Sequence, residues 1–147
     1  MKRIAKFFAL TRSDRALLLR TFAPLVAMRL AMWTLPFARV REICDAMSRP
    51  MRADPSGAPP SAERIAWAVA ALSRVVPRAD NCLVRALTTG IVLKRYGYPS
   101  ELKIGVMKPV GGRFEAHAWL ESDGVVVIGD FQLDRYAAMA APESVAR

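Results

Sequence analysis

The sequence predicts an α+β domain in which helices come first and a small antiparallel sheet follows. Up to about residue 96, apolar residues recur at the three- and four-residue spacing of amphipathic helices. From residue 101 the pattern changes to the two-residue alternation of half-buried strands. Asp123-Gly124 is a strong signal for a tight hairpin turn between two of these strands.

Residues 1–48 are expected to form an N-terminal helical region. Ser13 can cap a helix that begins at the next residue, and its apolar stripe continues past Pro24. Pro24 either kinks this helix or starts a second one, and the helix should stop near Pro36. A shorter helix is expected over residues 38–47.

Residues 49–60 contain four prolines and a glycine, which predicts a loop or linker. This segment separates the helical region from residues 61–147, where the candidate chemistry lies. A chain of 147 residues nevertheless fits one compact domain, and we expect one overall.

Two further helices are predicted after the linker. Ser61 can cap the first, which should end at Pro77. Cys82 opens the second, which should run to about Tyr96 with Gly97 as its C-cap. The expected buried face of the first helix consists of Ile65, Val69, Leu72 and Val76.

Three strands and two turns complete the prediction. Alternation over 102–106 predicts a half-buried strand, and residues 108–113 form a turn. In the following strand, alternation puts His117 and Trp119 on one face, together with Glu115 and Glu121. The continuous apolar run 125–128 predicts a strand buried on both faces.

The composition favours an acidic partner and some exposed apolar surface. The net charge is +9, the isoelectric point about 10.4, the apolar content 53% and the mean hydropathy +0.17. Aromatic residues do not interleave with the basic ones and no nucleic-acid motif is present, so nucleic-acid binding is not expected.

The sequence argues against secretion and against stable membrane insertion. The apolar run near the N-terminus is only four residues, shorter than a secretory signal requires. The longer apolar stretch 22–38 carries Arg29 at its middle and is interrupted by two prolines. A buried or partner-docking helix fits it better, and we expect a cytoplasmic protein.

The two cysteines, Cys44 and Cys82, do not make a disulfide framework. Cys44 is expected to be a small buried apolar residue. One histidine cannot build a zinc site without unusual help, so no metal and no cofactor are expected.

Cys82, His117 and Asp130 are the candidate catalytic residues. A helix start lowers the pKa of a thiol, and its free N–H groups can hold an oxyanion. His117 would take the thiol proton, and Asp130 would accept from the other ring nitrogen. The hairpin should bring Asp130 near positions 115–117. Asp123, in the turn, and Asp134, beyond the strand, are rival carboxylates.

Three further residues are candidates for substrate binding. Asn81 is expected to cap the Cys82 helix, with an oxyanion role as the alternative. Arg85 lies about one turn onward, where solvent or a substrate carboxylate could meet it. Trp119 either shields the site and lines a peptide groove or packs in the core.

A resemblance rests on Cys82-Leu83-Val84-Arg85-Ala86-Leu87, on residues 93–98, on the strand 102–106, and on Ala116-His117-Ala118-Trp119-Leu120-Glu121 with Asp123-Gly124 after it. In order and spacing these resemble the transglutaminase-like branch of the papain-type cysteine hydrolases. Within that branch the chain is most similar to the leader peptidases of lasso-peptide biosynthesis. The resemblance covers roughly residues 61–135, and no motif is assigned to the first 60.

The resemblance implies a cysteine-protease core, with the Cys-bearing helix packed on a small sheet, and a catalytic Cys82-His117-Asp130 triad. Such an enzyme removes the leader from a ribosomally made precursor peptide, and an asparagine-synthetase-like cyclase then closes a macrolactam. With no room for a leader-binding domain, this chain resembles the protease half of the split form and should need a separate leader-binding protein. The alternatives are a transglutaminase-like acyltransferase and a catalytically inactive basic adaptor.

Overall fold

The computed structural model describes residues 10–51, 58–107, 112–130, 133 and 136–139. Over these residues the chain forms helices and then an antiparallel sheet, so the predicted α+β class is confirmed. The helices are α2 (Arg12–Thr34), α3 (Phe37–Met47), α4 (Ala62–Ser73) and α5 (Cys82–Arg95). The strands are β1 (Glu101–Met107), β2 (Glu115–Ser122), β3 (Val125–Ile128) and β4 (Ala137–Met139).

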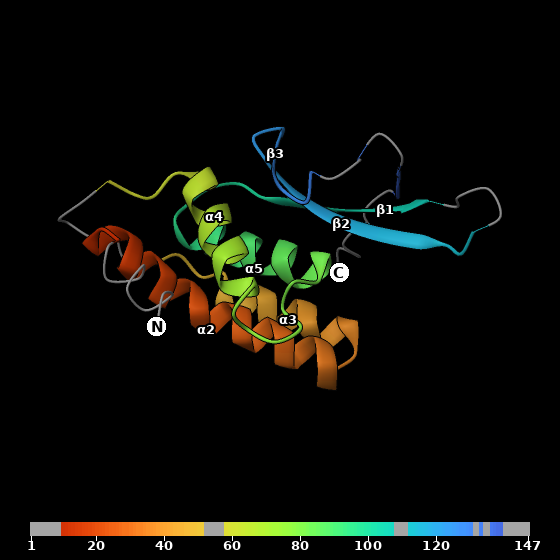
Figure 1. Cartoon of the computed structure of the whole chain (residues 1–147), viewed down its shortest axis with the longest axis horizontal. Helices are drawn as coiled ribbons and strands as arrows, with labels where there is room; N and C mark the ends of the chain where they lie inside the picture. The colour runs from red at the N-terminus through yellow and green to blue at the C-terminus, as the bar shows by residue number, and fades with distance from the viewer. Residues whose placement is uncertain (1–9, 52–57, 108–111, 131–132, 134–135, 140–147) are drawn as a thin grey trace.

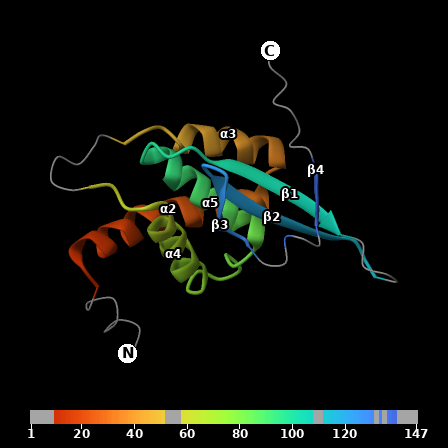
Figure 2. The same ribbon diagram turned by 90° about the horizontal axis from the view of Figure 1, so that it is seen from above.

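The helices lie on one side of the sheet. Figure 1 shows α5 beneath the sheet, with α2 and α3 farther from it on the other side of α5. Figure 2, seen from above, shows β1 and β2 running over α5. Helix α5 contacts the three other described helices as well as β1, β2 and β3, so it is the element around which the fold is built.

Helix α2 is one continuous helix of 23 residues. Its cap is Thr11, whose side chain accepts a hydrogen bond from the N–H of Asp14, so the predicted Ser13 cap is wrong. Pro24 lies inside the helix and neither ends it nor starts a second one. Proline normally costs an interior helical hydrogen bond. Here Pro24 is itself buried, and buried residues both before and after it pack the two halves of the helix against the core.

The end of α2 agrees with the sequence, since the helix closes just before Pro36, where the N–H of Leu35 binds the Ala31 carbonyl at 2.8 Å. By length and composition alone α2 is able to cross a membrane, but 39% of its most apolar stretch is buried in the fold. The core helix of a globular protein passes the same test.

Local caps define the next two helices. The Ser61 hydroxyl accepts from the N–H of Arg64 at 3.3 Å, as expected for the start of α4. Helix α4 ends at Ser73, four residues before Pro77, because the next residues turn back onto the Leu72 carbonyl. Helix α5 runs from Cys82 to Arg95 and is followed by Gly97 with φ +82°, which confirms both predicted ends.

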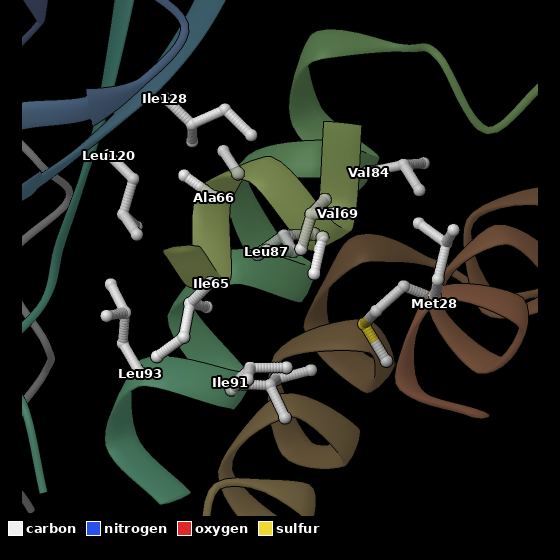
Figure 3. Close-up of a cluster of buried hydrophobic side chains, with 14 of the residues drawn as sticks. Met28, Ile65, Ala66, Val69, Val84, Leu87, Ile91, Leu93, Leu120 and Ile128 are labelled. Atoms are coloured by element: carbon white, nitrogen blue, oxygen red, sulfur yellow. The ribbon is translucent and has the colours of Figure 1, made fainter. Parts of the chain in front are cut away.

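The apolar core lies between the sheet and the helices. Figure 3 shows Leu120 and Ile128 of the sheet pointing towards side chains of α4 and α5. A methyl group on Gly90 of α5 would stand 3.4 Å from Cδ1 of Leu120, so helix and strand approach closely. The fully buried large side chains include Leu25, Met28, Val40, Ile65, Val69, Ile91 and Leu93. Each contributes about 1.5–3 kcal/mol by leaving water.

The sheet has the strand order β3-β2-β1-β4. Asp123 and Gly124 both have positive φ, 51° and 76°, which is the backbone of a two-residue hairpin turn and confirms that prediction. Val125 is 64% exposed, so the expected burial of β3 on both faces is wrong, because β3 lies at an edge of the sheet. Strand β4, paired with β1, was not predicted. Of the predicted turn 108–113, residues 108–111 lie outside the described residues.

Candidate active site

Cys82 is the first residue of α5, and its thiol is partly buried. Asn81 precedes it with an extended backbone, and the Asn81 side-chain oxygen accepts a hydrogen bond from the N–H of Leu83 at 2.9 Å. Asn81 is therefore the helix cap, as the sequence predicts. The cap also decides that the helix begins at Cys82, so the thiol lies beside the free N–H groups of the first turn.

Few backbone N–H groups in the first turn of α5 are free to bind an oxyanion. Because the N–H of Leu83 is bound to Asn81, it is not free to bind an oxyanion. Within the described part of the chain, no hydrogen bond uses the N–H of Cys82 itself. This amide, next to the thiol, is the donor best placed for the oxygen of a tetrahedral intermediate.

His117 is in the middle of β2, opposite Gly105 of β1. Its Nε2 lies 2.8 Å from the main-chain oxygen of Gly129. A carbonyl oxygen only accepts hydrogen bonds, so Nε2 carries the proton in this contact. In the neutral ring the other nitrogen, Nδ1, is then the basic one.

Two aromatic rings flank the imidazole. The Trp119 ring is stacked on it at a centroid distance of 6.4 Å, and the Tyr136 ring is tilted against it at 5.2 Å. Trp119 is 6% exposed, and its indole N–H donates to Glu121 at 3.0 Å. Trp119 therefore covers the imidazole, and it lies outside the apolar cluster formed with the helices.

Gly105 provides the space for these rings. A methyl group at Gly105 would lie 2.9 Å from the Trp119 ring and 2.9 Å from Cβ of Tyr136. Neither Gly105 nor Tyr136 was among the predicted site residues. The available signal was a glycine inside an alternating strand, which often marks a close approach of another group.

Cys82 and His117 are not joined by a hydrogen bond in the described structure. Along β2 the side chains alternate: Leu120 faces α5, whereas His117 shares the opposite face with Trp119. Figures 1 and 2 show the first turn of α5 below the stretch that leaves β3, which is the stretch that supplies the His117 acceptor.

Asp130 follows the His117 acceptor directly, but its own side chain is exposed. Among the described residues, its carboxylate forms no hydrogen bond or ion pair with His117 or with any other side chain. Leu120 pairs with Ile128, and this register, continued past the end of β3, places Asp130 opposite Ala118, one residue from His117. Of the rival carboxylates, Asp123 lies in the exposed hairpin turn and Asp134 lies outside the described residues.

Arg85 lies one turn into α5 and is partly buried. Its Nε is buried and has no hydrogen-bond partner among the described residues. Burying such a donor without a partner costs free energy. Arg85 therefore remains a candidate for contact with a substrate oxygen.

Cys44 behaves as the packing residue that the sequence predicts. Its sulfur lies 3.3 Å from the sulfur of Met28, and burial raises the pKa of its thiol to about 11. Such a thiol is a poor nucleophile at neutral pH. Over the described ranges, no group of three or more His, Cys, Asp or Glu residues could hold a metal ion.

Comparison with known proteins identifies the fold. Residues 22–141 match the family model described as the transglutaminase-like superfamily, whereas no curated protein and no solved structure matches the chain. The match covers more than half of the sequence and extends into α2 and α3, to which the sequence alone assigned no motif. Members of this superfamily are typically cysteine-dependent enzymes and include peptidases and acyltransferases. The chain belongs to the transglutaminase-like superfamily.

Proposed function

We propose that this chain is a cysteine peptidase that removes the leader from a ribosomally made lasso-peptide precursor. The observation that carries the proposal is Cys82 at the capped N-terminus of α5, in a transglutaminase-like fold whose single histidine has one ring nitrogen engaged and one free to act as base. The order Cys82, His117, Asp130 matches the lasso leader peptidases described above.

The proposed reaction has two steps. The Cys82 thiolate attacks the carbonyl carbon of the scissile peptide bond, and the N–H of Cys82 binds the oxyanion. His117 has taken the thiol proton at Nδ1 and returns it to the leaving amine as the C–N bond breaks. Water, giving a proton to the same nitrogen, then attacks the thioester, and the C–S bond breaks to release the leader as a carboxylic acid.

This mechanism needs the thiol and the imidazole in contact. In the free protein His117 lies on the face of β2 opposite to the face that packs on α5, so the proposal requires substrate binding to bring the imidazole and the Cys82 thiol together. Asp130 is the proposed third member, because a carboxylate one residue from the His117 acceptor favours the imidazolium that forms during the reaction. Arg85, with its unpartnered Nε, is the proposed contact for a substrate oxygen.

The partners follow from the same resemblance. Cleavage frees the core amino group, which an asparagine-synthetase-like cyclase would join to an Asp or Glu side chain. A separate leader-binding protein would deliver the precursor in the cytoplasm and raise its local concentration at the peptidase. The net charge of +9 suits an acidic partner.

Helix α2 supplies a surface on which such a protein could dock. Its inner face is buried, but Leu19, Phe22, Leu30 and Trp33 are between 48% and 73% exposed. Their spacing puts these four residues, here called the α2 stripe, on one side of the helix. Exposed apolar side chains gathered on one face are typical of protein-binding sites.

The peptidase assignment is tested by cleavage of a precursor, followed by mass spectrometry. Cys82→Ala and His117→Ala should abolish cleavage without loss of fold, while Cys44→Ala, the matched control, should cleave normally. Hydrolysis adds one water to the products, whereas acyl transfer joins the acyl group to an amine, so product masses separate the peptidase from the acyltransferase. Equal loss of activity in folded Cys82→Ala and Cys44→Ala proteins would refute the nucleophile.

The docking surface is tested by Leu19→Glu and Trp33→Glu, with Val75→Glu as the control at an exposed apolar position elsewhere. The leader-binding protein should accelerate cleavage by the wild type and by Val75→Glu. It should not accelerate the two stripe variants, whose basal cleavage should be unchanged. Full-rate, selective cleavage by the isolated wild-type chain would show that no such partner is needed.

A further inference from the structure

We propose that the main-chain carbonyl of Gly129, and not a carboxylate, sets the tautomer of His117, with Gly129 as a positioning residue. The Nε2–O distance of 2.8 Å is that of a good N–H···O hydrogen bond. It keeps the proton on Nε2 and leaves Nδ1 unprotonated in the neutral ring.

The backbone brings this oxygen to the ring by a conformation that only glycine adopts easily. Gly129 has φ +86°, immediately after β3 ends. A Cβ on Gly129 would lie 2.8 Å from the carbonyl oxygen of Ala118 and 2.9 Å from Cβ of Trp119. Any side chain at this position would therefore be strained and would push the Gly129 segment away from β2.

Two aromatic neighbours also hold the imidazole ring in one plane. Trp119 stacks on it with an interplanar angle of 20°, and Tyr136 lies against it at 34°. The Trp119 indole is in turn held by its hydrogen bond to Glu121 and by contact with Gly105. A ring confined in this way keeps Nε2 directed at the Gly129 oxygen.

Asp130 does not contact the imidazole. Its carboxylate is exposed, and the position that an orienting carboxylate would occupy at Nε2 is filled by the Gly129 oxygen. Asp130 can still favour the imidazolium by its charge, but it does not need to choose the tautomer. The catalytic use of this tautomer rests on the proposed function, whereas the tautomer itself does not.

The chain is well suited to a direct measurement, because His117 is its only histidine. Protein labelled with ¹⁵N in the imidazole gives one pair of ring nitrogen signals, and their couplings to the ring C–H protons show which nitrogen bears hydrogen. In the neutral state we expect the Nε2–H tautomer in the wild type, in Cys82→Ala and in Asp130→Asn. Gly129→Ala, where folded, should give a mixture of tautomers.

Two results would overturn the proposal: the Nδ1–H tautomer in the wild type, or a loss of the Nε2–H tautomer in Asp130→Asn. These readouts do not need Gly129→Ala to fold.

Kinetics provide a second measure. Where an aspartate orients the histidine, its replacement by asparagine gives the wrong tautomer and lowers kcat by about 10⁴-fold. We expect Asp130→Asn to lose far less. If no substrate is cleaved but the Nε2–H tautomer is found, the proposed function fails and this inference stands.

Discussion

Replacing Gly105 by alanine should destabilise the protein and disturb the rings around His117. The added methyl group would lie 2.9 Å from both the Trp119 ring and Cβ of Tyr136, well inside normal contact distance. Trp119 is almost fully buried and hydrogen-bonded to Glu121, so it cannot move without losing packing. Overpacking of this kind costs about 1–3 kcal/mol.

Gly90→Ala is the matched control, because it adds the same methyl group on the other side of β2. There the nearest atom, Cδ1 of Leu120, is 3.4 Å away and belongs to a flexible side chain. Alanine in the middle of a helix is favoured over glycine by up to about 1 kcal/mol. The two variants should therefore differ in unfolding free energy by about 1–4 kcal/mol.

The assay is urea or thermal unfolding of both variants and the wild type, followed by tryptophan fluorescence and circular dichroism. For a domain of this size each kcal/mol corresponds to roughly 2–4 °C in Tm. Gly105→Ala should also change the His117 ring signals in the ¹⁵N spectrum, and Gly90→Ala should not. Equal stability of the two variants would refute the claim that Trp119 and Tyr136 close over Gly105.

Three further predictions concern single side chains. Burial raises the pKa of the Cys44 thiol to about 11, so iodoacetamide at mildly alkaline pH should alkylate Cys82 first in the native protein. Both thiols should be labelled only after unfolding, and peptide mass spectrometry shows which cysteine carries the label. Asp14 accepts a hydrogen bond from Arg64 at 2.7 Å, and this contact lowers the pKa of the Asp14 carboxyl. The pair therefore stabilises the fold at pH values above the ordinary carboxyl pKa. This stabilisation is lost as the pH falls through the lowered pKa of the native state. Asp14→Asn should thus be less stable than the wild type near neutral pH but not in acid. The same difference in unfolding free energy between variant and wild type at both pH values would contradict this. Asn81→Ala removes the α5 cap and should lower the unfolding free energy, measured with denaturant, by about 1 kcal/mol. It should also slow the alkylation of Cys82. Wild-type stability of this variant would show that the cap is not needed.

Local signals in the sequence were enough to predict most element boundaries. The Ser61 and Asn81 caps, the Gly97 end of α5 and the Asp123-Gly124 turn each depend on residues within a few positions of one another. The same is true of the helix-start position of Cys82. Alternation along β2 also predicted that His117 and Trp119 share one face, and their rings are stacked in the structure.

Predictions failed where the outcome depended on distant residues. Pro24 stays inside α2 because the helix packs along its length against α4 and α5, which a local rule for proline does not include. The apolar run of β3 is an edge strand, because the fourth strand joined the sheet next to β1 and not next to β3. Strand β4 has only three residues and leaves no clear periodicity in the sequence.

The sequence by itself determined the α+β class, the helix start at Cys82 and the face of β2 that carries His117, because caps, turns and periodicity act over one or two turns of chain. Tertiary structure alone decided which atom accepts the hydrogen bond from the His117 ring. A bulge in the β2–β3 pairing and the positive φ of Gly129 carry a main-chain oxygen to Nε2, and that oxygen has no signature among the residue types. Tertiary structure also decided the role of Gly105, since the space above a strand is visible only once Trp119 and Tyr136 have closed over it.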